Sequence, residues 1–269
     1  MKRLTLFSAI AVSTLFLSCS QVPLTGRSQL SLVDDAVLQQ QATDAYQQFL
    51  SDPSTKVIRS GSDAQSVQNV GSKLASAINR YMQTNGYGDK YNYQYQFTLV
   101  ESKDINAWCM PGGKVAIYSG ILPVTRDDAG LATVMAHEIA HAIAQHAAER
   151  YSQMTLAQTG GSLVGAAVGG RSEGTQQIVG QLYGIGGQLA LLKYSRNQES
   201  EADRLGLIFM SMAGYNPDNA VAFWQRMMVA KEGNGAPPEF LSSHPSDATR
   251  IAAIQKLLPE ARQFYAGTK

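Results

Sequence analysis

Apolar positions along the chain recur mainly at helical spacing. One apolar stripe runs through residues 33–50 and stops before Pro53. A second runs through residues 63–82, with Ser62 as its expected N-cap and Asn85-Gly86 at its end. The same spacing predicts later helices at residues 128–151, with Asp127 as N-cap, at 198–213, at 217–231 and after Pro245. The protein is therefore predicted to be mainly helical.

Two short segments have the pattern of strands. Residues 93–100 alternate between apolar and polar side chains, and residues 114–118 follow a turn at Pro111-Gly112-Gly113. In the second strand, Val115 and Ile117 are expected on one face of the sheet. These strands predict an α+β fold in which a small twisted β-sheet accompanies the helices.

Two uncharged stretches, residues 151–170 and 175–192, raise the question of membrane spans. Five glycines interrupt the first stretch and four glutamines the second, whereas a spanning helix needs about 20 mostly apolar residues. We therefore expect a glycine-rich loop followed by one packed helix.

The first 18 residues have the layout of an export signal. Lys2 and Arg3 precede an apolar run over residues 4–17, which is followed by Cys19. The segment before this cysteine resembles a bacterial lipobox, although Phe16 stands where a leucine is usual. Ordinary cleavage and an uncleaved anchor are the alternatives. We expect a signal peptide at residues 1–18, lipidation of Cys19, a lipid-anchored tether at 19–32 and one domain at 33–269.

Composition limits the class of partner. The 269 residues carry 22 basic and 21 acidic side chains, and 44% of them are hydrophobic. Such a chain is neither disordered nor collagen-like, and it lacks the basic excess that nucleic-acid binding requires. Two cysteines cannot form a disulfide framework. We expect Cys109 to be a packed side chain and not a nucleophile.

The decisive motif is His137-Glu138-Ile139-Ala140-His141 in the helix predicted at 128–151. Residues four apart lie on one helix face, so both imidazoles can point at one metal ion, with Glu138 at its edge. The alternative is a polar helix face with two unpaired histidines. It is disfavoured because the helix is otherwise nearly uncharged, and burial would leave these groups unsatisfied. The motif predicts a zinc site.

A hydrolytic zinc site needs three protein ligands and an open fourth position. Glu199 and Asp203 are four residues apart in a later predicted helix, which favours Glu199 as the third ligand. Asp203 would then accept the other ring N–H of a histidine ligand. Glu201 is rotated toward the opposite side, and an exposed acidic patch is the alternative. His146 lies about 180° around the helix from His137, so we expect it to have a packing or capping role.

Taken together, these motifs resemble the membrane-associated zinc metallopeptidase family, which includes the CAAX prenyl protease, the heat-shock protease HtpX and the periplasmic outer-membrane assembly protease BepA. The likeness covers about residues 63–258 and extends to Asn106-Ala107, Ser119-Gly120, His244-Pro245 and Arg250-Ile251. The transmembrane segments of HtpX and the prenyl protease are missing. The resemblance is therefore to the lipid-anchored, BepA-like branch.

The resemblance implies a zincin-like (gluzincin) fold with one Zn²⁺ per chain, bound by His137, His141 and Glu199. It also implies that His244 can occupy the open zinc position and hold the enzyme latent. The chemistry allows another role, because a tetrahedral oxyanion needs a donor that His244 or Arg250 could supply. An ordinary loop histidine before Pro245 is the third possibility.

We therefore predict a zinc-dependent endopeptidase with Glu138 as general base and a zinc-activated water. An extended substrate is expected to add as a strand at the sheet edge formed by Lys114, Val115, Ala116 and Ile117, near Asn106. The expected substrates are unfolded or misassembled envelope proteins, in the bacterial periplasm at the outer or inner membrane. One alternative is a non-catalytic zinc-containing chaperone or assembly factor. Another is a zinc hydrolase of non-peptide substrates.

Overall fold

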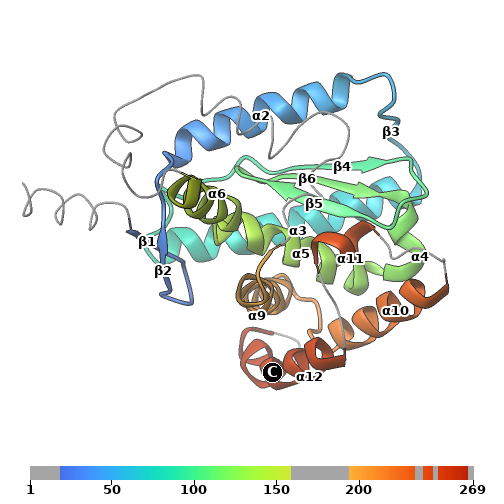
Figure 1. The fold of residues 1–269 in the computed structure, drawn as a ribbon. Coiled ribbons are helices and arrows are strands. Elements are labelled where there is room, and N and C mark those ends of the chain that lie inside the picture. Colours follow the sequence, from blue (N-terminus) through green and yellow to red (C-terminus); the bar gives the residue numbers. More distant parts are fainter. Residues whose placement is uncertain (1–18, 159–193, 234–238, 245–247, 266–269) are drawn as a thin grey trace, which may run out of the picture.

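The computed structural model of the protein describes residues 19–158, 194–233, 239–244 and 248–265 (Figure 1). The predicted signal peptide lies outside the described residues. The same holds for the packed helix expected at 175–192 and for most of the glycine-rich loop.

A four-stranded mixed sheet lies near the centre of the fold. Its strands are β3 (Val57–Ile58), β4 (Gln96–Val100), β5 (Ala107–Met110) and β6 (Lys114–Tyr118), in the order β3-β4-β6-β5. The strand predicted at 93–100 starts later, at Gln96. β6 pairs in parallel with β4 and antiparallel with β5.

The prediction that β6 forms the edge of the sheet is wrong. Both of its sides are hydrogen-bonded, and all five of its residues are buried. Such a short run, apolar apart from Lys114, is typical of a strand covered on both faces. Among the described strands, β5 is the edge on this side.

Helices cover both faces of the sheet (Figure 1). On one face, Ala116 and Tyr118 pack with α2 (Asp35–Ser51) and α6 (His146–Gln158). On the other, Val115 and Ile117 join the larger core with α3 (Ser62–Thr84) and α5 (Asp128–Ile143), which confirms that these two residues share a face. Helix α3 begins at the predicted place, but Gly61 is its N-cap, and no side chain caps it.

The C-terminal half adds a helical layer below α5 (Figure 1). The helix α9 (Arg196–Met212) packs along α5, and α12 (Ala248–Ala261) packs on α9. The remaining elements after β6 are the 3-10 turn Ser119–Ile121, α4 (Leu122–Thr125), α9 (Arg196–Met212), α10 (Asn219–Gly233), α11 (Glu239–Ser243), α12 (Ala248–Ala261) and the 3-10 turn Arg262–Phe264. The predicted α+β fold, mainly helical with a small sheet, is confirmed.

One predicted helix is in fact two. The helix expected at 128–151 stops at Ile143, Gln145 has a φ of +54°, and α6 begins at His146. A positive φ at a non-glycine residue is uncommon and ends regular α-helix. The chain therefore changes direction immediately after the histidine motif.

The segment expected as a tether has regular structure. Strands β1 (Cys19–Gln21) and β2 (Ser28–Leu30) form an antiparallel hairpin. The backbone that follows the hairpin is held on α6, where the N–H of Leu32 donates to Ser152 Oγ at 2.9 Å. Whether this segment also carries a lipid stays a prediction.

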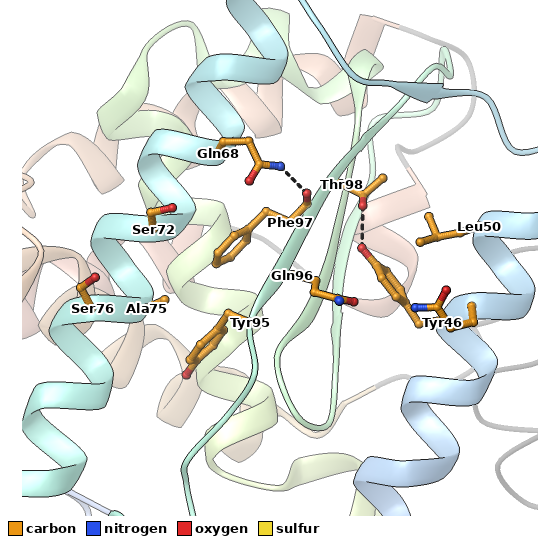
Figure 2. A pocket seen from close by; sticks show the side chains of 11 residues that line it. Tyr46, Leu50, Gln68, Ser72, Ala75, Ser76, Tyr95, Gln96, Phe97 and Thr98 are labelled. Atoms are coloured by element: carbon orange, nitrogen blue, oxygen red, sulfur yellow. Dashed lines mark hydrogen bonds between the residues drawn. The ribbon is translucent and has the colours of Figure 1, made fainter.

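An open cavity of about 540 Å³ lies between α2, α3 and β4 (Figure 2). Tyr46 from α2 reaches Thr98 at 2.6 Å, and Gln68 from α3 donates to the carbonyl oxygen of Phe97 at 2.6 Å. None of its lining residues belongs to the histidine motif.

Among the described residues, no helix combines the length and apolar content that crossing a membrane requires.

Candidate metal centre

Helix α5 presents its two motif histidines to one side. Asp127 caps the helix as predicted, accepting from the backbone N–H of Gly130 at 2.8 Å. His137 and His141 follow one turn apart, and both are buried. Helix α9 approaches closely because Gly206 faces His137: a Cβ at that glycine would lie 3.1 Å from the histidine backbone. Close helix packing therefore brings the α9 side chains to the motif.

Three predicted ligands meet in one cluster. The Nε2 atoms of His137 and His141 are 3.1 Å apart. Glu199 from α9 places Oε1 at 3.3 Å from His141 Nε2 and Oε2 at 3.6 Å from His137 Nε2. Ligand atoms bound tetrahedrally at 2.0–2.1 Å from one zinc ion are about 3.3 Å apart. The donor atoms are thus spaced as the ligands of a single metal ion.

The protonation pattern of the imidazoles also fits a cation. Asp203 Oδ1 lies 3.1 Å from His137 Nδ1 and is an acceptor, so that nitrogen carries the ring proton. The Nε2 lone pair then points into the cluster. Burial lowers the pKa of both motif histidines, which favours the neutral form that metal ligands need. Two buried lone pairs at this distance repel each other unless a cation lies between them.

Arg250 from α12 neutralises the carboxylates of α9. Its Nη1 lies 2.9 Å from Glu199 Oε2, and its Nε and Nη2 donate to Asp203 at 2.9 and 2.7 Å. The guanidinium also lies over the ring of Trp224, 3.6 Å from its centroid. Burial opposes the charge, but the two carboxylates raise the pKa of Arg250. The expected oxyanion donor is therefore occupied by carboxylates in this conformation.

Glu138 lies beside the cluster and is not one of the groups whose donor atoms make it up. Its carboxylate is buried, and Oε1 accepts no hydrogen bond among the described residues. His244 Nε2 lies 3.5 Å from this oxygen. Burial raises the pKa of Glu138 to about 7. An unpartnered carboxylate of this kind can take up and release a proton next to the metal position.

His244 from the end of α11 completes the cluster. Its Nδ1 lies 2.9 Å from Glu199 Oε1 and 3.3 Å from His137 Nε2. Four donor atoms, one each from His137, His141, Glu199 and His244, lie within 4.8 Å of one another. The ring is held by stacking on Phe240, with centroids 4.6 Å apart. The Nδ1 atom of His244 thus lies among the atoms that could hold a metal ion.

The described residues close around the cluster. The two cavities that touch His137 and His141 hold about 10 Å³ each, which is close to the lower limit for a single water molecule. Tyr194 stacks on His141 with ring centroids 4.0 Å apart. Neither of these two cavities among the described residues has room for a peptide.

The direction predicted for His146, about 180° around the helix from His137, is wrong. The break at Gln145 turns its ring back, so that Nδ1 lies 2.8 Å from His141 Nδ1 and Nε2 lies 3.0 Å from Glu201 Oε2. Burial lowers the pKa of His146. Although burial opposes it, hydrogen bonds from His146, Thr25 and Arg27 lower the pKa of Glu201 to about 2. Sequence spacing missed this contact because it assumed an unbroken helix.

The residues predicted to bind substrate lie in the sheet and not at its free edge. Lys114 donates from Nζ to the carbonyl oxygen of Gln94 at 2.6 Å, and Val115, Ala116 and Ile117 are fully buried between two strands. Asn106 is buried just before β5. Since the backbone of β6 is paired on both sides, it cannot accept a further strand.

Cys109 packs against the hydrophobic core, as expected. Burial raises the pKa of its thiol well above the ordinary range, which disfavours the thiolate. Nothing in the described contacts of this cysteine indicates a nucleophile.

Comparison with known proteins indicates the family of this chain. The model of peptidase family M48 matches residues 62–258. The mitochondrial metalloendopeptidase OMA1 of Schizosaccharomyces pombe is 30% identical over 248 residues, which are 92% of this chain and 68% of that protein. OMA1 of Saccharomyces cerevisiae is 37% identical over 60% of this chain and 45% of that protein.

A bacterial relative also matches. The beta-barrel assembly-enhancing protease of Escherichia coli K12 is 26% identical over 59% of this chain. This chain spans 33% of the length of that protein. The family match covers most of the chain and includes all four cluster residues. The family predicted from the motifs is thereby confirmed, and the chain belongs to peptidase family M48, the metallopeptidases to which OMA1 and the beta-barrel assembly-enhancing protease are related.

Proposed function

We propose that this protein is a zinc-dependent endopeptidase. The observation that carries the proposal is the buried donor cluster of His137, His141 and Glu199 with the unpartnered carboxylate of Glu138 beside it. Two imidazoles and a carboxylate are the donors of hydrolytic zinc sites. When bound there, zinc would polarise the scissile carbonyl and acidify the attacking water.

The roles of the other side chains follow from their contacts. Glu138 is the general base that accepts the proton of the attacking water and returns it to the leaving amine, because its carboxylate lies beside the cluster and its Oε1 accepts no hydrogen bond among the described residues. Asp203 orients His137 through Nδ1. Arg250 holds Glu199 and Asp203 in place and compensates their charge.

His244 has two candidate roles, and its geometry favours latency. The Nδ1 atom lies among the metal-ligand atoms, where it would complete a four-coordinate site with no place for water. An oxyanion donor would instead approach the cluster without joining it. We infer that His244 must leave this position before a peptide is hydrolysed.

The substrate strand is proposed to pair with β5. Among the described strands, β5 has one partner and therefore a free backbone edge, whereas β6 has two partners and no free edge. Main-chain pairing tolerates many sequences, which suits a protease of unfolded chains. The expected leader with Cys19 and the name of the Escherichia coli relative support envelope proteins as substrates, in the periplasm at a membrane surface.

Metal analysis tests the proposal directly. The purified protein is expected to contain close to one zinc per chain, because one cluster supplies the ligands. Removal of zinc by 1,10-phenanthroline should abolish casein cleavage, and added zinc should restore it, while magnesium and calcium should not. Cleavage that continues in metal-free protein would contradict the proposal.

Replacement of His244 separates its two roles. If His244 holds the enzyme latent, His244→Ala should raise the initial rate of casein cleavage and leave the zinc content unchanged. If it is an oxyanion donor, the same variant should lower kcat by roughly 10²–10³-fold. Initial rates of both proteins, measured at equal zinc occupancy, decide between them.

A further inference from the structure

We propose that His146 and Glu201 are positioning residues for His141, and that Arg27 of the N-terminal hairpin holds them in place. The inference rests on the proposed zinc centre. It assigns a role to a buried histidine, a buried carboxylate and an arginine that the mechanism above does not use.

The contacts form one continuous line from the hairpin to the cluster. His141 Nδ1 lies 2.8 Å from His146 Nδ1, and His146 Nε2 lies 3.0 Å from Glu201 Oε2. At the other end of this line lies Arg27, whose Nε donates to Glu201 Oε2 at 2.7 Å. Thr25, also in the hairpin loop, donates to Glu201 Oε1 at 2.6 Å.

The direction of the hydrogen bonds along this line is fixed by the carboxylate. Glu201 accepts hydrogen bonds from Arg27 and Thr25 through both of its oxygens, so we assign the ring proton of His146 to Nε2, which faces this carboxylate. The Nδ1 of neutral His146 is then an acceptor, and His141 must donate from Nδ1. The lone pair of His141 Nε2 is thereby left facing the cluster, as a metal ligand requires.

The two motif histidines are therefore oriented by different means from the same helix. Asp203 accepts directly from His137 Nδ1 at 3.1 Å, whereas Glu201 reaches His141 through an intervening imidazole. Glu199 lies in the cluster itself, so three acidic residues at alternate positions of α9 each contact a different part of the site. The near-opposite direction of Glu201 on the helix, which argued against a ligand role, suits this contact because His146, at the start of α6, lies on that side.

Arg27 compensates two buried carboxylates at once. Besides Glu201, it donates from Nη1 and Nη2 to the oxygens of Glu149 at 2.7 and 3.0 Å. Both carboxylates are 8% exposed, and without the guanidinium they would repel each other in a poorly solvated site. Loss of Arg27 should let Glu201 move, which would release His146.

Zinc affinity is the measurement that tests the inference. Metal-free protein is titrated against a chromogenic zinc chelator, the unfolding midpoint of the metal-free form is recorded, and the visible spectrum of the cobalt-loaded protein reports ligand geometry. His146→Leu should raise the zinc dissociation constant roughly 10- to 100-fold. His146→Asn, whose side-chain oxygen can accept from His141 Nδ1, should remain close to wild type.

A matched pair of arginines tests the hairpin end. Arg27→Met is expected to weaken zinc binding in the same direction as His146→Leu, though less. Arg204 is the control, because its ion pair with Glu260 has the same 2.7 Å length and its side chain is 33% exposed against 34% for Arg27. Arg204→Met should leave zinc affinity and the cobalt spectrum unchanged.

Several results would overturn the inference. Wild-type affinity in folded His146→Leu would do so, as would equal losses in His146→Leu and His146→Asn, because a packing role alone predicts no rescue by asparagine. If His146→Leu does not fold, equal affinities of Arg27→Met and Arg204→Met would overturn it. A wild-type protein that binds no zinc would remove the proposed metal centre itself, which is a distinct outcome.

Discussion

The Glu138→Gln variant is expected to cleave casein roughly 10²–10⁴-fold more slowly than the wild-type protein and to retain its zinc. Glutamine has nearly the same shape but cannot accept a proton at neutral pH. Glu138 Oε1 makes no hydrogen bond among the described residues, so the substitution breaks no described hydrogen bond there and changes only the 3.5 Å contact with His244 Nε2. Cleavage rates in the wild type and in the His244→Ala background, with zinc content measured alongside, check this prediction.

The same variant separates the enzyme from its rival, a zinc-containing chaperone. Binding of an unfolded client needs no carboxylate beside the metal, so it should survive in Glu138→Gln under either function. Loss of cleavage with client binding retained indicates the enzyme. Glu260→Gln, at a surface ion pair with Arg204, is the control and should cleave at the wild-type rate. Equal cleavage by wild type and Glu138→Gln would remove Glu138 from the mechanism.

Replacement of Arg250 is expected to have the largest effect on stability. Arg250→Met should lower the free energy of unfolding of the metal-free protein by about 3–5 kcal/mol, because it leaves Glu199 and Asp203 as buried, uncompensated charges. For a chain of this length that corresponds to a fall in Tm of roughly 6–20 °C. Bound zinc should reduce the loss, since the cation compensates Glu199 in its turn.

A surface pair provides the comparison for this measurement. Arg262 and Asp218 form an ion pair of 2.6 Å, but the side chains are 46% and 44% exposed. Arg262→Met should therefore change the free energy of unfolding by no more than about 1 kcal/mol. Thermal or urea unfolding of the metal-free proteins distinguishes the two cases. Similar small losses in both variants would show that Glu199 and Asp203 do not need Arg250 to compensate their charge.

Much of the fold follows from local patterns. The apolar stripes of α2, α3, α9 and α10 placed these helices within a few residues of their observed ends, and Asp127 caps α5 as expected. These features depend on spacing and capping chemistry that a short segment contains by itself. The break after Ile143 was missed because Ala144 and Gln145 have no helix-stopping signature of glycine or proline.

The motif of α5 and the acidic pair of α9 were sufficient to name His137, His141 and Glu199, three members of the buried cluster, because residues four apart share a helix face wherever the helix lies. How the two helices bring them together was not visible in the sequence. It depends on the packing of α9 along α5, which Gly206 allows at His137. The strand order is a similar case: the segment 114–118 was correctly identified as a strand, but its central position depends on pairing with two partners from elsewhere in the chain.

Local sequence thus determined which side chains are able to bind a metal and which segments form helices. Tertiary structure alone decided what surrounds them: Arg250 between two carboxylates, and the contact of His146 with His141. The physical reason is the range of the interactions. Helix periodicity and capping act over a few neighbouring residues, whereas desolvation and charge compensation depend on groups that only folding brings within a few ångströms.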